Sequence, residues 1–93
     1  MNLKLKFLKP YSDAVGKTDL DLELKRPTDV DGLLKTLVAQ YPKLEKEVYG
    51  KDGKPTEYLS LFLNSEPLTE ENWLKKKLKD GDEIIFFFPV SGG

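Results

Sequence analysis

The chain has 93 residues, of which 39% are hydrophobic and 33% are charged, and its formal net charge is -1. This length is typical of one small domain with a single core, and the charge argues against a nucleic acid or an anionic membrane as the main partner. Cysteine and histidine are absent, which excludes disulfides, a cysteine nucleophile, a Ser-His-Asp triad and the usual zinc ligands.

The chain carries no pattern typical of a membrane segment or a secretory signal. Its longest apolar run, residues 84–88, is far below the roughly 20 residues of a membrane-spanning helix. The first ten residues alternate polar and apolar side chains, as in a strand. We therefore expect a cytoplasmic protein with no membrane partner. Abundant lysine and glutamate are also compatible with a thermophilic source.

The first 25 residues predict a β-hairpin. Residues 3–8 alternate, and so do residues 19–25, where leucines alternate with acidic residues. Residues 10–16, which contain a proline and a glycine, are expected to form the connecting loop. The apolar positions of the first strand all fall on one face: Leu3, Leu5 and Phe7.

Residues 29–41 change to the period of a helix. Thr28 is expected to cap this helix, with Asp31 at the spacing of a capping box, and Pro42 ends it. Gly32 lowers helix propensity, so we expect close packing against the sheet at this position. A single apolar stripe follows the helical spacing: Val30, Leu33, Leu34, Leu37, Val38 and Tyr41.

The middle of the chain predicts short helical turns and a strand. Residues 43–49 suit one or two turns with Leu44 and Val48 on one side, before a surface loop at residues 50–57. Residues 58–64 predict a strand with apolar residues on both faces.

A turn and a short helix precede the last strand. Residues 64–67 are expected to form the turn. Thr69 is expected to cap the helix, which brings Trp73 and Leu74 near the core.

The last strand is the clearest element. Asp80 and Gly81 form the preceding turn, and residues 84–88 are apolar on both faces. So small a chain has too few helices to cover both faces of a sheet. We therefore expect one face of this strand to contact a partner protein.

Two basic patterns favour structural interpretations. Residues 50–56 (GKDGKPT) suggest a phosphate-binding loop, but Pro55 separates the lysine from the threonine, so an ordinary loop is favoured. A lysine run is compatible with a docking patch, although acidic neighbours favour a solvated face: Lys75, Lys76, Lys77 and Lys79.

Two carboxylate pairs are the only candidates for metal binding, and both lie where caps and turns favour aspartate. We expect no metal site, and no carboxylate pair is suited to acid–base catalysis. The protein is therefore not expected to be an enzyme by itself. The pairs are Asp29 with Asp31 and Asp80 with Asp82.

Residues 89–93 form the expected protruding tail. A Gly-Gly end is compatible with a remnant of an expression vector or with a frayed terminus, but its place after an apolar strand favours a function. Pro89 ends strand pairing, and glycines can thread a narrow channel. We expect Pro89, Val90, Ser91 and Gly92 to thread into an active site, where the Gly93 carboxylate attacks the α-phosphate of ATP.

Several features together resemble the ubiquitin-like β-grasp sulfur carriers, most closely the small subunit of molybdopterin synthase. They are the element order, the helix at residues 28–37, the turn at residues 63–66 and the ending at residues 78–93, LKDGDEIIFFFPVSGG. Phe88 stands where the family usually has the first of two prolines. The resemblance implies an α+β fold with a mixed β-sheet packed on one main helix plus short helical turns, as a single domain over residues 1–93.

The resemblance also implies a mechanism. An ATP-dependent activating enzyme adenylates Gly93, sulfur transfer gives a thiocarboxylate, and the large subunit of molybdopterin synthase uses it in molybdenum or tungsten cofactor synthesis. The chain itself binds no cofactor. The implied partner-binding residues are Ile85, Phe87 and Phe88, whereas Ile84 and Phe86 face the helix. Alternatives are tRNA thiolation, thiamine synthesis, attachment to protein lysines, or partner binding with an inert tail.

Overall fold

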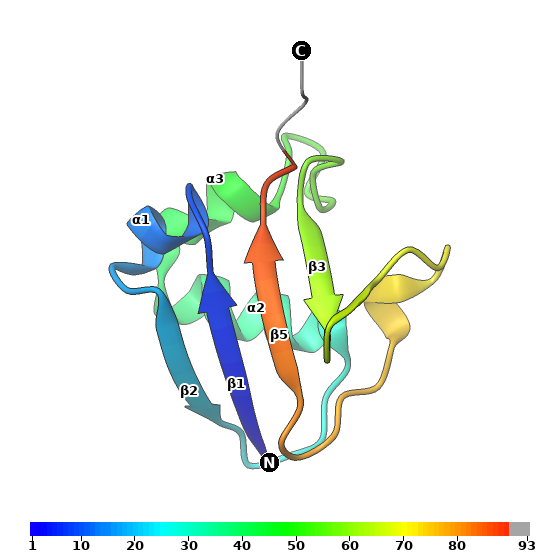
Figure 1. Ribbon diagram of the computed structural model, residues 1–93. Helices are drawn as coiled ribbons and strands as arrows, with labels where there is room; N and C mark the ends of the chain where they lie inside the picture. Colours follow the sequence, from blue (N-terminus) through cyan, green and yellow to red (C-terminus); the bar gives the residue numbers. More distant parts are fainter. Residues whose placement is uncertain (90–93) are drawn as a thin grey trace.

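The protein is shown by a computed structural model, which describes residues 1–89 (Figure 1). A five-stranded sheet in the order β2-β1-β5-β3-β4 carries the helices on one face. The strands are β1 (Asn2–Phe7), β2 (Asp19–Glu23), β3 (Ser60–Leu63), β4 (Glu66–Pro67) and β5 (Glu83–Phe87). The helices are α1 (Tyr11–Val15), α2 (Val30–Gln40) and α3 (Glu45–Val48), with 3-10 turns η1 (Pro42–Leu44) and η2 (Trp73–Lys75).

The sheet is mixed because its two central strands run in parallel. β1 pairs with β5 in parallel, with Leu5 opposite Ile84. β2 pairs with β1 and β3 pairs with β5, both antiparallel. The predicted hairpin and the predicted α+β fold, a mixed sheet on one main helix, are therefore confirmed.

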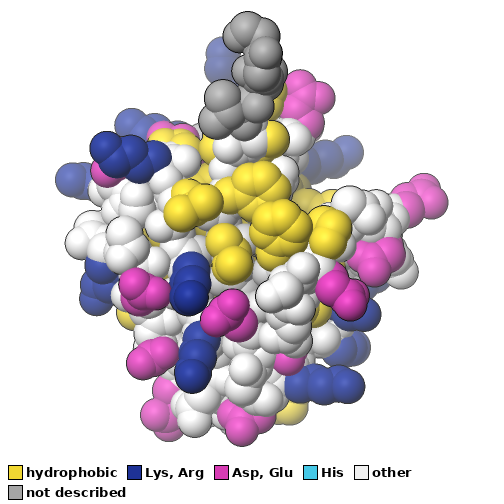
Figure 2. Space-filling view, in the orientation of Figure 1, with side chains coloured by type: hydrophobic (Ala, Val, Ile, Leu, Met, Phe, Trp, Pro, Cys, Tyr) yellow, Lys and Arg dark blue, Asp and Glu magenta, His cyan; other side chains and the backbone are white. Residues whose placement is uncertain are grey.

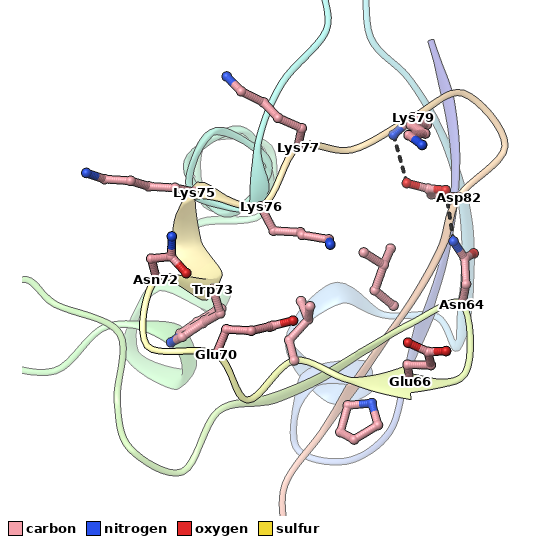
Figure 3. A pocket seen from close by; sticks show the side chains of 13 residues that line it. Asn64, Glu66, Glu70, Asn72, Trp73, Lys75, Lys76, Lys77, Lys79 and Asp82 are labelled. Carbon is pink, nitrogen blue, oxygen red and sulfur yellow. Dashed lines mark hydrogen bonds between the residues drawn. The ribbon is translucent and has the colours of Figure 1, made fainter.

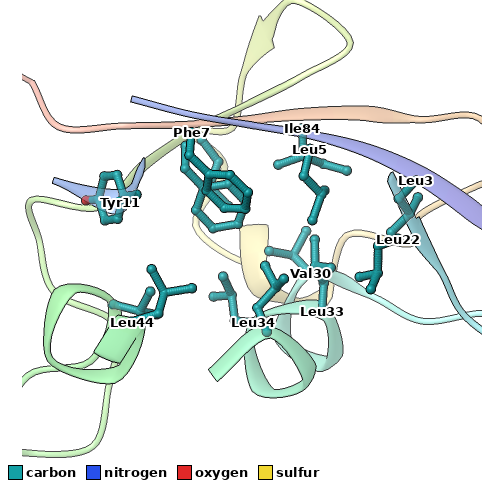
Figure 4. Packing of buried hydrophobic residues seen from close by; sticks show 14 of the residues in the cluster. Leu3, Leu5, Phe7, Tyr11, Leu22, Val30, Leu33, Leu34, Leu44 and Ile84 are labelled. Carbon is teal, nitrogen blue, oxygen red and sulfur yellow. The ribbon is translucent and has the colours of Figure 1, made fainter. Parts of the chain in front are cut away.

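The core lies between the sheet and the helices, where aliphatic side chains of α2 meet those of β1 and β5 (Figure 4). The α2 stripe predicted from the sequence supplies Leu33, Leu34 and Leu37, all fully buried. The turn η1 and the helix α3 confirm the predicted helical turns, and they bury Leu44 and Val48 fully. Within residues 1–89 this layer covers one face of the sheet, and the other face is left open by the described elements.

The start of α2 differs from the prediction. Asp29, not Thr28, is the N-cap, and its carboxylate accepts a hydrogen bond from the Gly32 amide at 2.9 Å. Asp31 instead forms an ion pair with Lys35 at 3.0 Å. A β-carbon at position 32 would collide with the Thr28 hydroxyl. A side chain at position 32 would therefore displace the Thr28 hydroxyl, and since the nearest atoms belong to Thr28 and Asp29, the predicted close packing against the sheet is wrong.

The predicted loop at residues 10–16 contains the short helix α1. Tyr11 and Val15, one helical turn apart, are buried in the core. The helix ends at Gly16, whose φ of 88° is left-handed and therefore suits glycine. Five residues are too few for periodicity to distinguish a helix from a loop, and burial of Tyr11 against Phe86 stabilises the helix here.

The connection before β5 confirms the predicted turns but not the predicted cap. Asn64 and Ser65 both have positive φ at the β3–β4 turn, and Gly81 has a φ of 88° before β5. The turn η2 begins after Asn72 without a side-chain cap, so Thr69 does not cap it. Trp73 and its neighbour Leu74 pack against the core as predicted. Within residues 1–89, the helices are too short or too polar to cross a bilayer.

Candidate functional site

The two faces of β5 have different environments. Ile84 and Phe86 are fully buried beneath the helices, whereas Ile85 and Phe87 lie half-buried on the open face. This confirms the predicted face assignment. The alternation of a pleated strand explains it, because consecutive side chains point to opposite faces of the sheet.

An apolar patch occupies the half of the open face next to the end of β5 (Figure 2). We define it by Leu8, Phe62, Ile85 and Phe87. Phe62 lies opposite Ile85 in the β3–β5 register, and its ring stacks on Phe87 with centroids 4.7 Å apart. Leu8 follows β1 and continues its ladder, because its amide donates to the Phe86 carbonyl at 2.9 Å. Four neighbouring apolar side chains on an open sheet face are suited to a protein contact.

Sequence reasoning did not assign Leu8 and Phe62 to this site. Leu8 is 56% exposed, and it follows β1 at a position where the continued alternation of that strand would place a polar residue. Phe62 lies between Leu61 and Leu63, which are buried, and its side chain is on the other face of β3. In an alternating strand, the positions that face the open side usually carry polar residues. An apolar residue at such a position therefore indicates a patch on the open face, and this rule would have found both Leu8 and Phe62.

The other half of the open face is charged. Lys4 lies opposite Asp21 across the β1–β2 pair, and Lys6 lies opposite Asp19. The Lys6 ammonium also approaches the Glu83 carboxylate, at 3.8 Å. The charges alternate in sign across the strands, so this half favours solvent, whereas the apolar patch does not.

The C-terminal segment leaves the sheet beside the patch. Phe88, which follows β5 directly, is 40% exposed, and Pro89 is exposed. The Phe88 ring stacks on Tyr58, with centroids 5.5 Å apart and ring planes 21° apart. The remaining predicted tail residues lie outside the described residues: Val90, Ser91, Gly92 and Gly93.

A second surface feature is a hollow of about 710 Å³ at the opposite end of the sheet (Figure 3). Glu66 and Glu70 line it together with the lysine run predicted as a docking patch or a solvated face. Since all four lysines are exposed and acidic side chains lie among them, the solvated face is favoured. The lysines are Lys75, Lys76, Lys77 and Lys79.

The carboxylates considered for metal binding have structural hydrogen bonds. Asp29 caps α2, and Asp80 accepts from the Asn2 amide at 2.6 Å. Asp82, which is buried, accepts from the Asn64 side chain at 2.9 Å and from the Lys79 amide at 2.7 Å. Residues 1–89 contain no cluster of three or more side chains suited to hold a metal ion.

Two tyrosines with raised pKa values lie away from the apolar patch. Burial raises the pKa of Tyr11 to about 12, with a smaller contribution from the Glu47 carboxylate. Burial also raises the pKa of Tyr49, assisted by the Asp31 carboxylate. Within residues 1–89, both hydroxyl oxygens are buried without a hydrogen-bond partner. Tyr11 lies in the core and Tyr49 lies near α2, so neither is suited to act at the open face.

The mixed sheet, the helical layer on one face and the element order define a ubiquitin-like β-grasp protein. The chain belongs to the ThiS family of sulfur carriers, which it matches over residues 5–93. It therefore combines the ubiquitin-like β-grasp fold with membership of a sulfur-carrier family. The sequence-based prediction of the family is confirmed.

Two relatives from Haloferax volcanii match nearly the whole chain or all of it. Small archaeal modifier protein 1 is 28% identical over 91 residues, which are 98% of this chain and 100% of the relative. Small archaeal modifier protein 3 is 26% identical over 93 residues, which are all of both chains. The crystal structure of the first of these proteins superimposes with a TM-score of 0.84 at 27% identity, and the match covers 100% of each chain.

Two more distant structures share the fold. A putative molybdopterin converting factor subunit 1 from Pyrococcus furiosus matches with a TM-score of 0.76 at 22% identity, over 97% of this chain and 99% of that chain. A complex of subunits 1 and 2 of molybdopterin-converting factor from Helicobacter pylori 26695 contains a chain that matches with a TM-score of 0.63 at 20% identity, over 100% of both.

Proposed function

We propose that this protein is a sulfur carrier whose Gly93 carboxylate is adenylated and then converted to a thiocarboxylate. The observation that carries the proposal is the apolar patch beside the end of β5, directly before the segment that ends in Gly-Gly. An activating enzyme that binds the patch receives the C-terminal segment in a defined direction. The domain therefore serves to deliver its own carboxylate.

The chemistry proceeds through two displacements at the end of the chain. A Gly93 carboxylate oxygen attacks the α-phosphorus of ATP, pyrophosphate leaves, and an acyl-adenylate forms. A sulfur donor at the level of hydrosulfide then attacks the Gly93 carbonyl carbon and displaces AMP, which leaves the thiocarboxylate. Since the chain contains no cysteine, its C-terminal carbonyl carbon is the site where sulfur is carried.

The first candidate acceptor is a precursor of the molybdenum or tungsten pterin cofactor. In this role the chain is the small subunit of molybdopterin synthase, and the large subunit binds the apolar patch around Phe87 while it takes sulfur from Gly93. The ending that resembles this subunit supports the assignment.

The second candidate is attachment to proteins, and the full-length similarity to small archaeal modifier proteins 1 and 3 favours it. Here the amine of a substrate lysine attacks the activated Gly93 carbonyl, AMP leaves, and an isopeptide bond forms. Both candidates use the same adenylate, and they differ only in the nucleophile that follows.

Intact mass spectrometry tests the shared step. The protein is incubated with ATP, its activating enzyme and a sulfide source, and we expect the mass increase of one oxygen-to-sulfur exchange. A variant that lacks Gly93 should show no exchange and an unchanged melting temperature, because an exposed chain end contributes little to stability. An unmodified wild-type protein, or a variant that still gains sulfur, contradicts the proposal.

Immunoblots of the source cells separate the two acceptors. Bands of higher mass that depend on Gly93 support protein attachment, whereas their absence together with sulfur transfer to the pterin precursor supports the synthase role. Replacing the activating enzyme with a catalytically inactive variant should abolish either outcome.

A further inference from the structure

Two exposed aromatic rings meet where the chain leaves the sheet. Tyr58 is 55% exposed and Phe88 is 40% exposed, yet their rings stack with centroids 5.5 Å apart. Phe88 is the first residue after β5 and directly precedes Pro89. The stack therefore lies at the start of the C-terminal segment, and neither ring belongs to the buried core.

The backbone ladder that holds β5 ends before this point. Pairing with β1 ends with Phe7 opposite Phe86, and pairing with β3 ends with Ser60 opposite Phe87. Pro89 has no amide hydrogen, so it cannot extend either ladder. In the described part of the chain, the ring of Tyr58 is thus positioned to restrain the segment from its side.

The backbone that carries Tyr58 has further anchors besides the pairing of Ser60 with Phe87 in β5. The Thr56 amide donates to the Val48 carbonyl at 2.8 Å, and the Leu59 amide donates to the Thr56 carbonyl at 3.2 Å. Leu59, the neighbour of Tyr58, is buried in the core. These contacts connect the base of Tyr58 to the end of α3 and to the core, so the ring is presented by an anchored backbone.

We propose that Tyr58 is a positioning residue that stacks on Phe88 and fixes the direction in which Phe88 and Pro89 leave the sheet, for insertion of the C-terminus into the activating enzyme. This inference rests on the proposed function. A chain whose direction at Phe88 and Pro89 is already fixed loses less conformational freedom when it binds, so the stack improves binding of the carrier and leaves the chemical step unchanged. The phenol hydroxyl has no part in this role, because the contact is between the ring faces.

Steady-state adenylation, followed by pyrophosphate release, tests the kinetic consequence. We expect Tyr58→Ala to raise KM for the carrier roughly two- to tenfold, the range that one aromatic pair supports, with kcat unchanged. Tyr58→Phe should retain the wild-type KM, and so should Glu57→Ala, an exposed neighbour outside the stack. An unchanged KM in Tyr58→Ala, or an equal loss in Tyr58→Phe, overturns the inference.

A measurement without the enzyme separates this inference from the proposed function. We expect Tyr58→Ala to lower the ¹H–¹⁵N heteronuclear NOE of the Phe88 amide, and Tyr58→Phe to leave it unchanged. This change supports the positioning role even if the wild-type protein is not adenylated, in which case the proposed function alone fails. Equal NOE values in the three proteins overturn the positioning role even if adenylation is normal.

Discussion

The two faces of β5 carry the same pair of residue types in opposite roles. Ile84 and Phe86 are fully buried between the sheet and α2, whereas Ile85 and Phe87 lie half-buried on the open face. Each face carries one isoleucine and one phenylalanine, and the two pairs differ only in the side of the sheet to which they point. One face therefore stabilises the domain, and the other remains available for a partner. This pairing provides an internal control for separating stability from binding.

The largest expected effect is the difference in stability between Phe86→Ala and Phe87→Ala. Removing the buried Phe86 ring leaves a cavity in the core and should lower the free energy of unfolding by about 3–5 kcal/mol. Removing Phe87 loses one ring stack on an open face and should cost about 1 kcal/mol. Urea denaturation measures both values, and losses of equal size would show that the open face also belongs to the core.

The next effect concerns binding at the open face. Phe87→Asp places a charge inside the apolar patch and should weaken binding to the activating enzyme by about 2–4 kcal/mol, as expected for a central contact residue. Lys4→Asp, on the same face but in the charged half, is the control and should bind nearly as the wild type does. Isothermal titration calorimetry measures both affinities. Equal weakening, or unfolding of Phe87→Asp, would contradict the division of this face.

The smallest expected effect is the pH dependence of stability that results from the burial of Tyr11 on the covered face. Unfolded tyrosine ionises near pH 10, whereas the pKa of buried Tyr11 is raised to about 12. Between these values the unfolded state loses the proton and the folded state keeps it, so stability falls as pH rises. The contribution is fully present below pH 10, and its loss by pH 12 amounts to about 2 kcal/mol.

Tyr11→Phe isolates this contribution. The difference in unfolding free energy between wild type and variant should shift by about 2 kcal/mol from pH 9 to pH 12, in favour of the variant. At pH 7 the variant should be about as stable as the wild type, since the buried hydroxyl has no partner within the described residues. A pH-independent difference would show that Tyr11 ionises freely in the folded protein.

Elements with a sustained period were predictable from the sequence. The α2 stripe and the alternation in β1 each repeat several times, which chance patterns rarely do. The prediction that one face of β5 is left uncovered was also correct. It required only the observation that so small a chain has too few helices to cover both apolar faces of this strand. The predicted roles of Ile85, Phe87, Phe88 and the Gly93 carboxylate remain predictions.

Elements that depend on contacts between distant residues were not predictable. The short helix α1 is stabilised by burial of Tyr11 against Phe86, which lies 75 residues further along the chain. The N-cap of α2 is Asp29 and not the predicted Thr28. Both residue types are good N-caps, and the conformation of the chain before the helix decides between them. The stack of Tyr58 on Phe88 connects two segments far apart in the sequence, and no local sequence pattern indicates that they meet.

The sequence by itself determined the fold class and the family, because these depend on periodicity, turn residues and the motif at the end of the chain. Only the tertiary structure decided that Leu8 and Phe62 join Ile85 and Phe87 in one patch. Strand order and register bring these residues together, and both are set by the packing of the whole sheet on α2. A local pattern assigns Leu8 and Phe62 to the open face, but it cannot report the strand order and register that bring them beside Ile85 and Phe87.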